Sequence, residues 1–350
     1  MIDAATIPFA WYADEDVFRR EQERIFEHAW HYGGHTGEVA EPGSYLTTRV
    51  GRIPIAVVRG RDGELRSFVN VCRHRGFEVV QGCGRRETLQ CAYHAWTYDL
   101  DGSLRAAPRS DLEPGFDKAE LGLKPAQVGT WGPFVFVNAD AGAPSLEETL
   151  ADLPAQVAEA GLDVDGLAFN RRVEFELEAN WKVIAENFLE CYHCQVAHPS
   201  FSAMVDVSPD AYELDANETF FTHRAPVKEN GIAAYDLGAN EIPRGQFHLV
   251  WPGIAMNVMP GRPNISIGPI RPLAPGRTLR FLDYFFAPDE DEAWIDDYLA
   301  FDDQVGVEDK TLVESVQRGV ASGALEGGRL LVSSEHLIAD FGRRVAAALA

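Results

Sequence analysis

Two short segments in the first third of the chain contain the residue types of a metal site. Cys72-Arg-His74 and Cys91-Ala-Tyr-His94 each supply one thiol and one imidazole, and 16 residues separate them. A zinc ion would take all four ligands at one tetrahedral centre. A [2Fe–2S] cluster would take both cysteines on one iron and both histidines on the other. Because zinc sites typically leave about two to four residues between paired cysteines, the mixed order favours the cluster.

A second set of ligand types lies near the middle of the chain. Glu190 and His193 are three residues apart, which places them on one face of the helix expected from about Trp181 into Cys194. His198 directly precedes Pro199, where this helix should have ended, so its side chain can turn back towards His193. Two histidines and one distant carboxylate form the ligand set of ferrous iron that activates oxygen.

The distant carboxylate is expected in a later helix, over about 292–318. Asp309 falls in the inward apolar stripe of that helix, where a carboxylate is costly unless it is paired or binds a metal. Asp302 shares the stripe and is a competing ligand. Glu308 projects about 100° away and fits less well.

Cys191 and Cys194 leave another interpretation open, because they flank His193 as a C-x-x-C pair. Such a pair alone could be a redox dithiol or part of a zinc site. A redox motif is expected at a helix start near a βαβ pattern, whereas this pair is expected late in a helix, which disfavours the redox interpretation. Cys83 has no partner and is interpreted as a spare thiol. The remaining histidines are assigned to structural or surface positions: His28, His31, His35, His223, His248 and His336.

The elements that must position these residues divide the chain in two. Strand-like alternation and hairpin turns predict a small all-β domain over about 40–142. The Ala-Gly-Ala-Pro stretch at 141–144 marks a boundary. Beyond it, helices mixed with antiparallel strands predict an α+β domain over 143–350. A helical segment over 1–39, including a helix at 18–28, is expected to pack on this second domain.

Composition narrows the function classes. With 31 basic and 54 acidic residues the formal charge is −23, which argues against nucleic acid as a partner and is compatible with a cationic substrate. The sequence shows no apolar stretch long enough for a membrane span and no export signal. We therefore predict a cytoplasmic location and no membrane association.

The segments from Cys72 to Gly76 and from Cys91 to Gly102 closely resemble the cluster domain of Rieske ring-hydroxylating and N-demethylating oxygenases. The resemblance implies an all-β Rieske [2Fe–2S] domain and a helix-grip catalytic domain that binds a mononuclear Fe(II). The stretch 308–319 resembles the family's final ligand segment, which moves the choice to Asp309. The implied cluster ligands are Cys72, His74, Cys91 and His94, and the implied iron ligands are His193, His198 and Asp309.

The resemblance also implies a homotrimer in which Glu190 links His94 of one subunit to His193 of the next. A glutamate at this position is similar to the branch that oxidises choline, carnitine or glycine betaine. A reductase, or a ferredoxin plus reductase, would supply electrons, and O2 would oxidise a small organic N-methyl substrate. The alternatives are aromatic ring hydroxylation and a non-enzymatic Rieske electron carrier. Candidate aromatics for an ammonium cage are Phe201, Tyr212, Phe220, Phe221, Phe247 and Trp251.

Overall fold

The computed structural model describes residues 4–350, which form two compact units. One unit is Ile25–Thr149, and the other combines Leu150–Ala350 with the chain up to Arg24. The N-terminal segment expected over 1–39 is therefore divided between them. Its second part belongs to the first unit because strand β1 (His31–His35) pairs with β10 (Phe134–Asn138).

The unit Ile25–Thr149 is built from two antiparallel sheets, as the alternating sequence pattern predicts. A seven-stranded sheet has the order β1-β10-β9-β4-β3-β2-β5, and a three-stranded sheet has the order β6-β7-β8. The remaining strands are β2 Ser44–Val50, β3 Ile53–Arg59, β4 Leu65–Val69, β5 Cys83–Arg85, β6 Leu89–Gln90, β7 Thr97–Tyr98, β8 Leu104–Ala106 and β9 Pro125–Trp131. Short 3-10 turns lie at Phe26–His28, Thr36–Val39, Ser110–Leu112 and Lys118–Leu121.

The second unit contains a seven-stranded antiparallel sheet with the order β11-β17-β16-β15-β14-β13-β12. Its strands are β11 Ala168–Leu177, β12 Glu213–Ala216, β13 Phe220–Pro226, β14 Arg244–Val250, β15 Ile254–Val258, β16 Asn264–Ala274 and β17 Arg277–Phe286. Every strand from β13 to β17 carries buried hydrophobic residues. Together the two units confirm the α+β fold.

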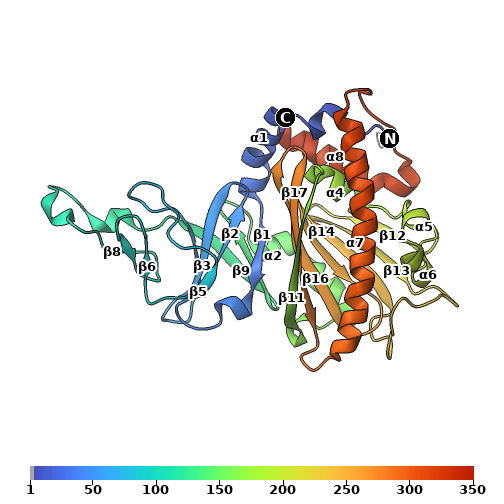
Figure 1. Cartoon of the computed structure of the whole chain (residues 1–350), viewed down its shortest axis with the longest axis horizontal. Coiled ribbons are helices and arrows are strands. Elements are labelled where there is room, and N and C mark those ends of the chain that lie inside the picture. The colour runs from blue at the N-terminus through green and yellow to red at the C-terminus, as the bar shows by residue number, and fades with distance from the viewer. Residues whose placement is uncertain (1–3) are drawn as a thin grey trace. The chain divides into compact units, whose positions relative to one another are not determined.

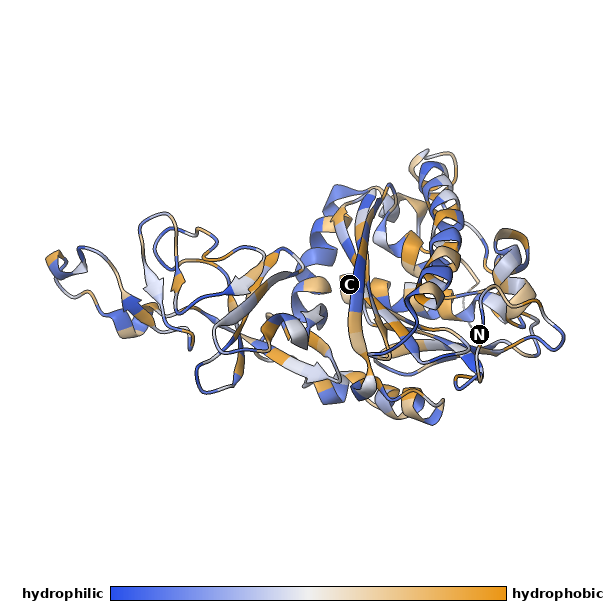
Figure 2. Ribbon diagram, turned by 60° about the horizontal axis from the view of Figure 1, so that its bottom comes forward, coloured by the Kyte–Doolittle hydropathy of each residue, from blue (hydrophilic) through white to orange (hydrophobic). Residues whose placement is uncertain are grey.

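Helices pack on one face of this sheet (Figure 1). Phe221 of β13 contacts Phe341 of α8, and Phe286 of β17 contacts Trp294 of α7. Hydrophilic and hydrophobic residues both occur along α7, as expected for a helix with one buried face (Figure 2). The helices are α1 Glu15–Arg24, α2 Leu146–Leu150, α3 Leu153–Glu159, α4 Trp181–Phe188, α5 Cys194–Ala197, α6 Pro199–Met204, α7 Glu292–Ala321 and α8 Val332–Leu349, with 3-10 turns at Phe9–Tyr12 and Val164–Gly166.

Helix α4 is shorter than the sequence pattern predicts. The Asn180 side chain accepts a hydrogen bond from the backbone N–H of Lys182 and starts the helix. The helix ends at Phe188 rather than continuing into Cys194. The Glu190 carboxylate accepts hydrogen bonds from the backbone N–H groups of Tyr192 and His193, and such local bonds compete with helical ones. Glu190 and His193 therefore lie in a loop, not on one helix face.

None of the helices among the described residues is long and apolar enough to cross a membrane.

Candidate metal sites

The two cluster segments adopt the same tight turn. In each, the cysteine carbonyl accepts a bond from the N–H four residues later, Gly76 and Ala95 respectively, at 3.0 Å. The N–H groups of Cys72 and Cys91 donate to carbonyls five residues later, at 2.8 Å. Gly76 and Ala95 both have positive φ, 77° and 58°, so each turn closes through a left-handed residue. The two cluster segments therefore have the same backbone conformation.

This geometry separates the two kinds of ligand. Cys72 and Cys91 are 2% exposed, whereas both histidines are exposed. The rings of His74 and His94 lie 4.6 Å apart between centroids, and Trp96 stacks on His74. Two buried thiols beneath two adjacent imidazoles match a [2Fe–2S] cluster that has its histidine-bound iron outermost. The two predicted cysteines lie next to each other, and so do the two predicted histidines.

Tyr98 orients one of the thiols. Its hydroxyl oxygen accepts a bond from the backbone N–H of Arg73 at 3.0 Å and lies 3.3 Å from the sulfur of Cys72. Burial holds the pKa of Tyr98 above its usual range, so the hydroxyl keeps its proton. A cluster-bound thiolate has no proton to donate, and Tyr98 would therefore donate to Cys72.

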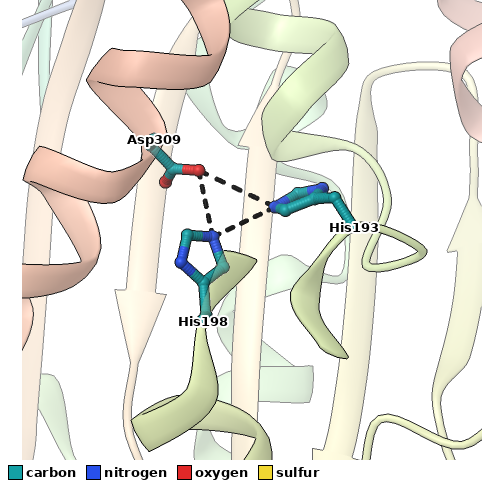
Figure 3. Close-up of side chains that lie close together, drawn as sticks. All are labelled: His193, His198 and Asp309. Carbon is teal, nitrogen blue, oxygen red and sulfur yellow. Dashed lines mark hydrogen bonds and ion pairs between the residues drawn. The ribbon is translucent and has the colours of Figure 1, made fainter. Parts of the chain in front are cut away.

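The second site brings His193, His198 and Asp309 together (Figure 3). The Nε2 atoms of the two histidines lie 3.1 Å apart. Oδ1 of Asp309 lies 3.1 Å from Nε2 of His198 and 3.7 Å from Nε2 of His193. Metal bonds of about 2.1 Å at angles of about 90–125° would place ligand atoms about 3.0–3.7 Å apart. The three residues thus fit one ion, and they leave the remaining coordination positions open.

Three different elements position these ligands. His193 precedes α5, and its carbonyl accepts bonds from the N–H groups of Val196 and Ala197. His198 ends α5 and precedes α6, which begins at Pro199. Asp309 lies near the middle of α7. Burial alone would raise the pKa of Asp309, but bonds to His198 and Asn187 lower it below its usual value, so the carboxylate is ionised.

The competing carboxylates of α7 have other partners. Asp302 accepts a 2.5 Å hydrogen bond from the Tyr284 hydroxyl and does not reach the histidines. Glu308 lies 2.8 Å from Nδ1 of His198, opposite the Nε2 that faces Asp309. Glu308 is therefore an orienting partner of a ligand. Sequence spacing disfavours Glu308 as a ligand but does not predict this contact with His198.

Asn187 is a further functional residue that sequence reasoning misses. Its amide donates a 2.8 Å bond to Oδ1 of Asp309. Glu190 contacts Nδ1 of His193 through Oε1, which is the half of the expected bridge that lies within one chain. Only the local spacing of Glu190 from His193 signals this contact in the sequence.

The proposed aromatic residues separate into two sets. Phe201, Tyr212 and Phe247 lie near Phe188 and His223, and we call these five residues the aromatic cluster. The Tyr212 hydroxyl lies 2.7 Å from Nδ1 of His223. The other three candidates have different neighbours: Phe221 and Trp251 contact Phe341, and Phe220 contacts His248.

Two domain families match the chain. Residues 29–116 match the Rieske [2Fe-2S] domain, and residues 164–350 match the catalytic domain of ring-hydroxylating α-subunits. The chain belongs to the Rieske ring-hydroxylating oxygenase family. It is therefore an oxygenase with a [2Fe–2S] cluster and a mononuclear iron, and it takes electrons from a reductase partner. The electron-carrier alternative is wrong, because the catalytic domain is present.

Relatives resemble the chain over almost its whole length. The carnitine monooxygenase oxygenase subunit of Acinetobacter pittii is 36% identical and covers 98% of this chain and 94% of its own. Choline monooxygenase of Beta vulgaris is 32% identical and covers 97% and 76% respectively. The structure of the quaternary ammonium Rieske monooxygenase CntA with L-carnitine has a TM-score of 0.85 at 32% identity, over 100% of this chain and 97% of that one.

Proposed function

We propose that this oxygenase hydroxylates a quaternary ammonium or related N-methyl compound, with O2 and reductase-derived electrons. The observation that carries the proposal is the glutamate at position 190, bonded to His193, in a chain that is similar over at least 97% of its length to carnitine and choline monooxygenases. Hydroxylation of an N-methyl group would give a hemiaminal, which releases formaldehyde and the demethylated amine.

The aromatic cluster supports a cationic substrate. Aromatic faces attract quaternary ammonium groups, and Phe188 and Phe247 flank His223 at 5.4 and 5.3 Å between ring centroids. Burial lowers the pKa of His223 to about 3, so its ring is neutral and does not repel a cation. Burial raises the pKa of Tyr212, and the charge of Glu190 raises it further, which supports a position of the aromatic cluster near the proposed bridge.

We assign the metal ligands by residue as part of this proposal. Cys72, His74, Cys91 and His94 would hold the cluster, and His193, His198 and Asp309 would hold the iron. Bound iron supplies the site at which O2 is activated. Glu190 would contact His94 of a neighbouring subunit in a homotrimer and complete the bridge from cluster to iron.

The decisive experiment is a product screen with an NADH-dependent reductase. We expect formaldehyde or a released amine from at least one of carnitine, choline and glycine betaine, and no product from flat aromatic hydrocarbons. Iron analysis of the same sample should give about three irons per chain, two in the cluster and one in the catalytic domain. Hydroxylated aromatics without any amine product would replace this proposal by ring hydroxylation.

A further inference from the structure

A disulfide joins Cys191 to Cys194 in the loop that carries Glu190 and His193. The function described above does not use this pair. We infer that Cys191 and Cys194 form a thiol–disulfide switch that controls how firmly the catalytic domain retains its iron. The inference concerns the loop itself and does not depend on the identity of the substrate.

The pair differs from the other three cysteines in its surroundings. Cys191 and Cys194 are 7% and 5% exposed and pack in a hydrophobic cluster with Phe201 and Met204. Cys72 and Cys91 are free thiols of the cluster segments, and Cys83 is exposed and free. Burial slows the reaction of the Cys191–Cys194 bond with bulk thiols, because little of either sulfur-bearing residue is exposed. Hydrogen peroxide formed at the iron site is a small oxidant, and both cysteines lie within two residues of His193 along the chain.

The bond covalently links the ligand loop to helix α5. Cys194 is the first residue of α5, and its carbonyl accepts bonds from the N–H of His198 at 2.9 Å and from Oγ of Ser202 at 2.8 Å. His193 lies inside the disulfide-closed segment. The disulfide thus ties the segment that contains His193 to the short helix that leads to His198.

Without the disulfide, fewer constraints hold this segment. Residues 189–193 lie between α4 and α5, and the Glu190 carboxylate accepts from the N–H groups of Tyr192 and His193. A disulfide across so few residues restricts the unfolded chain only slightly, because loop-closure entropy grows with loop length. The disulfide therefore has a local effect. It keeps His193 well ordered and changes the free energy of unfolding of the whole chain little.

Hydrogen peroxide is the oxidant that converts the two thiols of Cys191 and Cys194 to the disulfide. When O2 takes two electrons and two protons without oxidising substrate, it becomes hydrogen peroxide. Two thiols then reduce one hydrogen peroxide to two waters: the sulfurs lose two electrons, both S–H bonds break, and the S–S bond forms. A dithiol reductant reverses the change. Intracellular disulfides of this kind are typically transient and redox-sensing, which suits a pair beside an oxygen-activating centre.

The test measures Fe(II) release to a chromogenic chelator from the full chain, with the thiol state set and the reagents removed before Fe(II) is added, so that peroxide does not oxidise the iron itself. We expect iron release to be about 10-fold faster after reduction by a phosphine than after treatment with hydrogen peroxide. The reason is that removing a group that orients a metal ligand typically lowers metal affinity by about this factor or more. The Cys191→Ser/Cys194→Ser variant should release iron at the faster rate under both conditions. Cys83→Ser, which alters an exposed thiol, should respond as the unmodified chain does.

Alkylation and peptide mapping report the thiol state independently of activity. Protection of both Cys191 and Cys194 after peroxide treatment is expected. Equal iron release from the oxidised and reduced forms would overturn the inference, and so would full alkylation of both cysteines after peroxide. Both comparisons use the unmodified chain, so they hold even if the double variant folds poorly. Neither requires a substrate, so a failed product screen would leave this result intact.

Discussion

His198 is held on both sides by consecutive residues of one helix. Glu308 lies against its Nδ1 and Asp309 against its Nε2, at 2.8 and 3.1 Å. The Glu308 carboxylate favours the tautomer with a proton on Nδ1, which leaves the Nε2 lone pair free for a metal. The ring orientation therefore depends on a residue that does not touch the metal.

Replacing Glu308 should weaken iron binding. For Glu308→Ala we expect a loss of about 10- to 100-fold in Fe(II) affinity, because the His198 ring loses its orienting partner. Competition with a chelator measures this affinity. Asp303→Asn, which changes an exposed acid on the same helix, is the matched control and should bind iron normally. Unchanged affinity in Glu308→Ala would exclude the orienting role.

The bridge proposal predicts a defect in electron transfer without metal loss. Glu190→Gln should retain the cluster spectrum and all the iron, yet turnover should fall by about 100-fold, because the amide lacks the charge that holds two imidazoles. Single-turnover reoxidation of the reduced cluster, with O2 and substrate present, separates this step from binding. Glu190→Asp should keep part of the rate. Normal reoxidation in Glu190→Gln would refute the bridge.

Short-range spacing is enough to predict the residues of the cluster segments. Cys72 and His74, like Cys91 and His94, are positioned by turns that close within six residues. Asp309 is harder to predict from periodicity, because Asp302 lies in the same apolar stripe. The resemblance of the segment 308–319 favours Asp309, and the hydrogen bond from Tyr284 to Asp302 gives that competitor another partner. The roles of Asn187 and Glu308 depend on contacts between residues more than a hundred positions apart, which no local pattern contains.

At the scale of elements, α4 connects the N-terminal residues to the iron loop. The hydroxyl of Tyr12 donates a 2.7 Å bond to Glu186, and Nζ of Lys182 lies 2.5 Å from Glu21 of α1. Burial raises the pKa of Glu186 to about 7, against the lowering effects of Tyr12 and Lys182. The protein therefore favours the protonated Glu186, and ionising it costs stability.

The Glu186 carboxyl makes the free energy of unfolding decrease as pH rises. The pKa of Glu186 is about 7 in the fold, above its ordinary value of 4.5. The protonated carboxyl therefore contributes its full stabilisation below about pH 4.5, and this contribution is lost as pH rises through about 7. We expect Glu186→Gln to gain about 2–3 kcal/mol relative to the unmodified chain between pH 5 and 8.

Urea unfolding followed by tryptophan fluorescence measures this difference, because Trp181 lies in α4. Glu159→Gln, which alters an exposed glutamate at the end of α3, should show the pH profile of the unmodified chain. If the Glu186→Gln profile runs parallel to that of the unmodified chain, the carboxyl does not titrate as stated.

The elements themselves were largely predictable, and the exceptions have local causes. Alternation of apolar residues predicts strands at 45–50, 53–58 and 65–71, which lie within two residues of the observed ends of β2, β3 and β4. The apolar pattern after Trp181 continues through Cys194, but the Glu190 carboxylate caps backbone N–H groups and stops the helix. Periodicity reports which face is apolar, whereas the end of a helix depends on individual hydrogen bonds.

For the whole molecule, the proposed trimer makes each active centre depend on two subunits. A cluster-deficient subunit, Cys72→Ser, and an iron-deficient subunit, Asp309→Ala, should each be inactive alone. Random mixed trimers should recover about a quarter of normal activity, because one junction in four joins an intact cluster to a neighbour's intact iron in a closed ring. Co-expression with two affinity tags and an activity assay measures this. Electron transfer within one subunit would give no recovery.

The matched turns of the cluster segments have a consequence for the timing of catalysis. They bury both cysteines and leave His74 and His94 as the exposed ligands of the proposed cluster. Electron entry and electron exit would then share one small surface of this unit. A donor that stayed bound there would obstruct the transfer that follows, so brief contact with the reductase becomes a requirement of turnover rather than a sign of weak recognition.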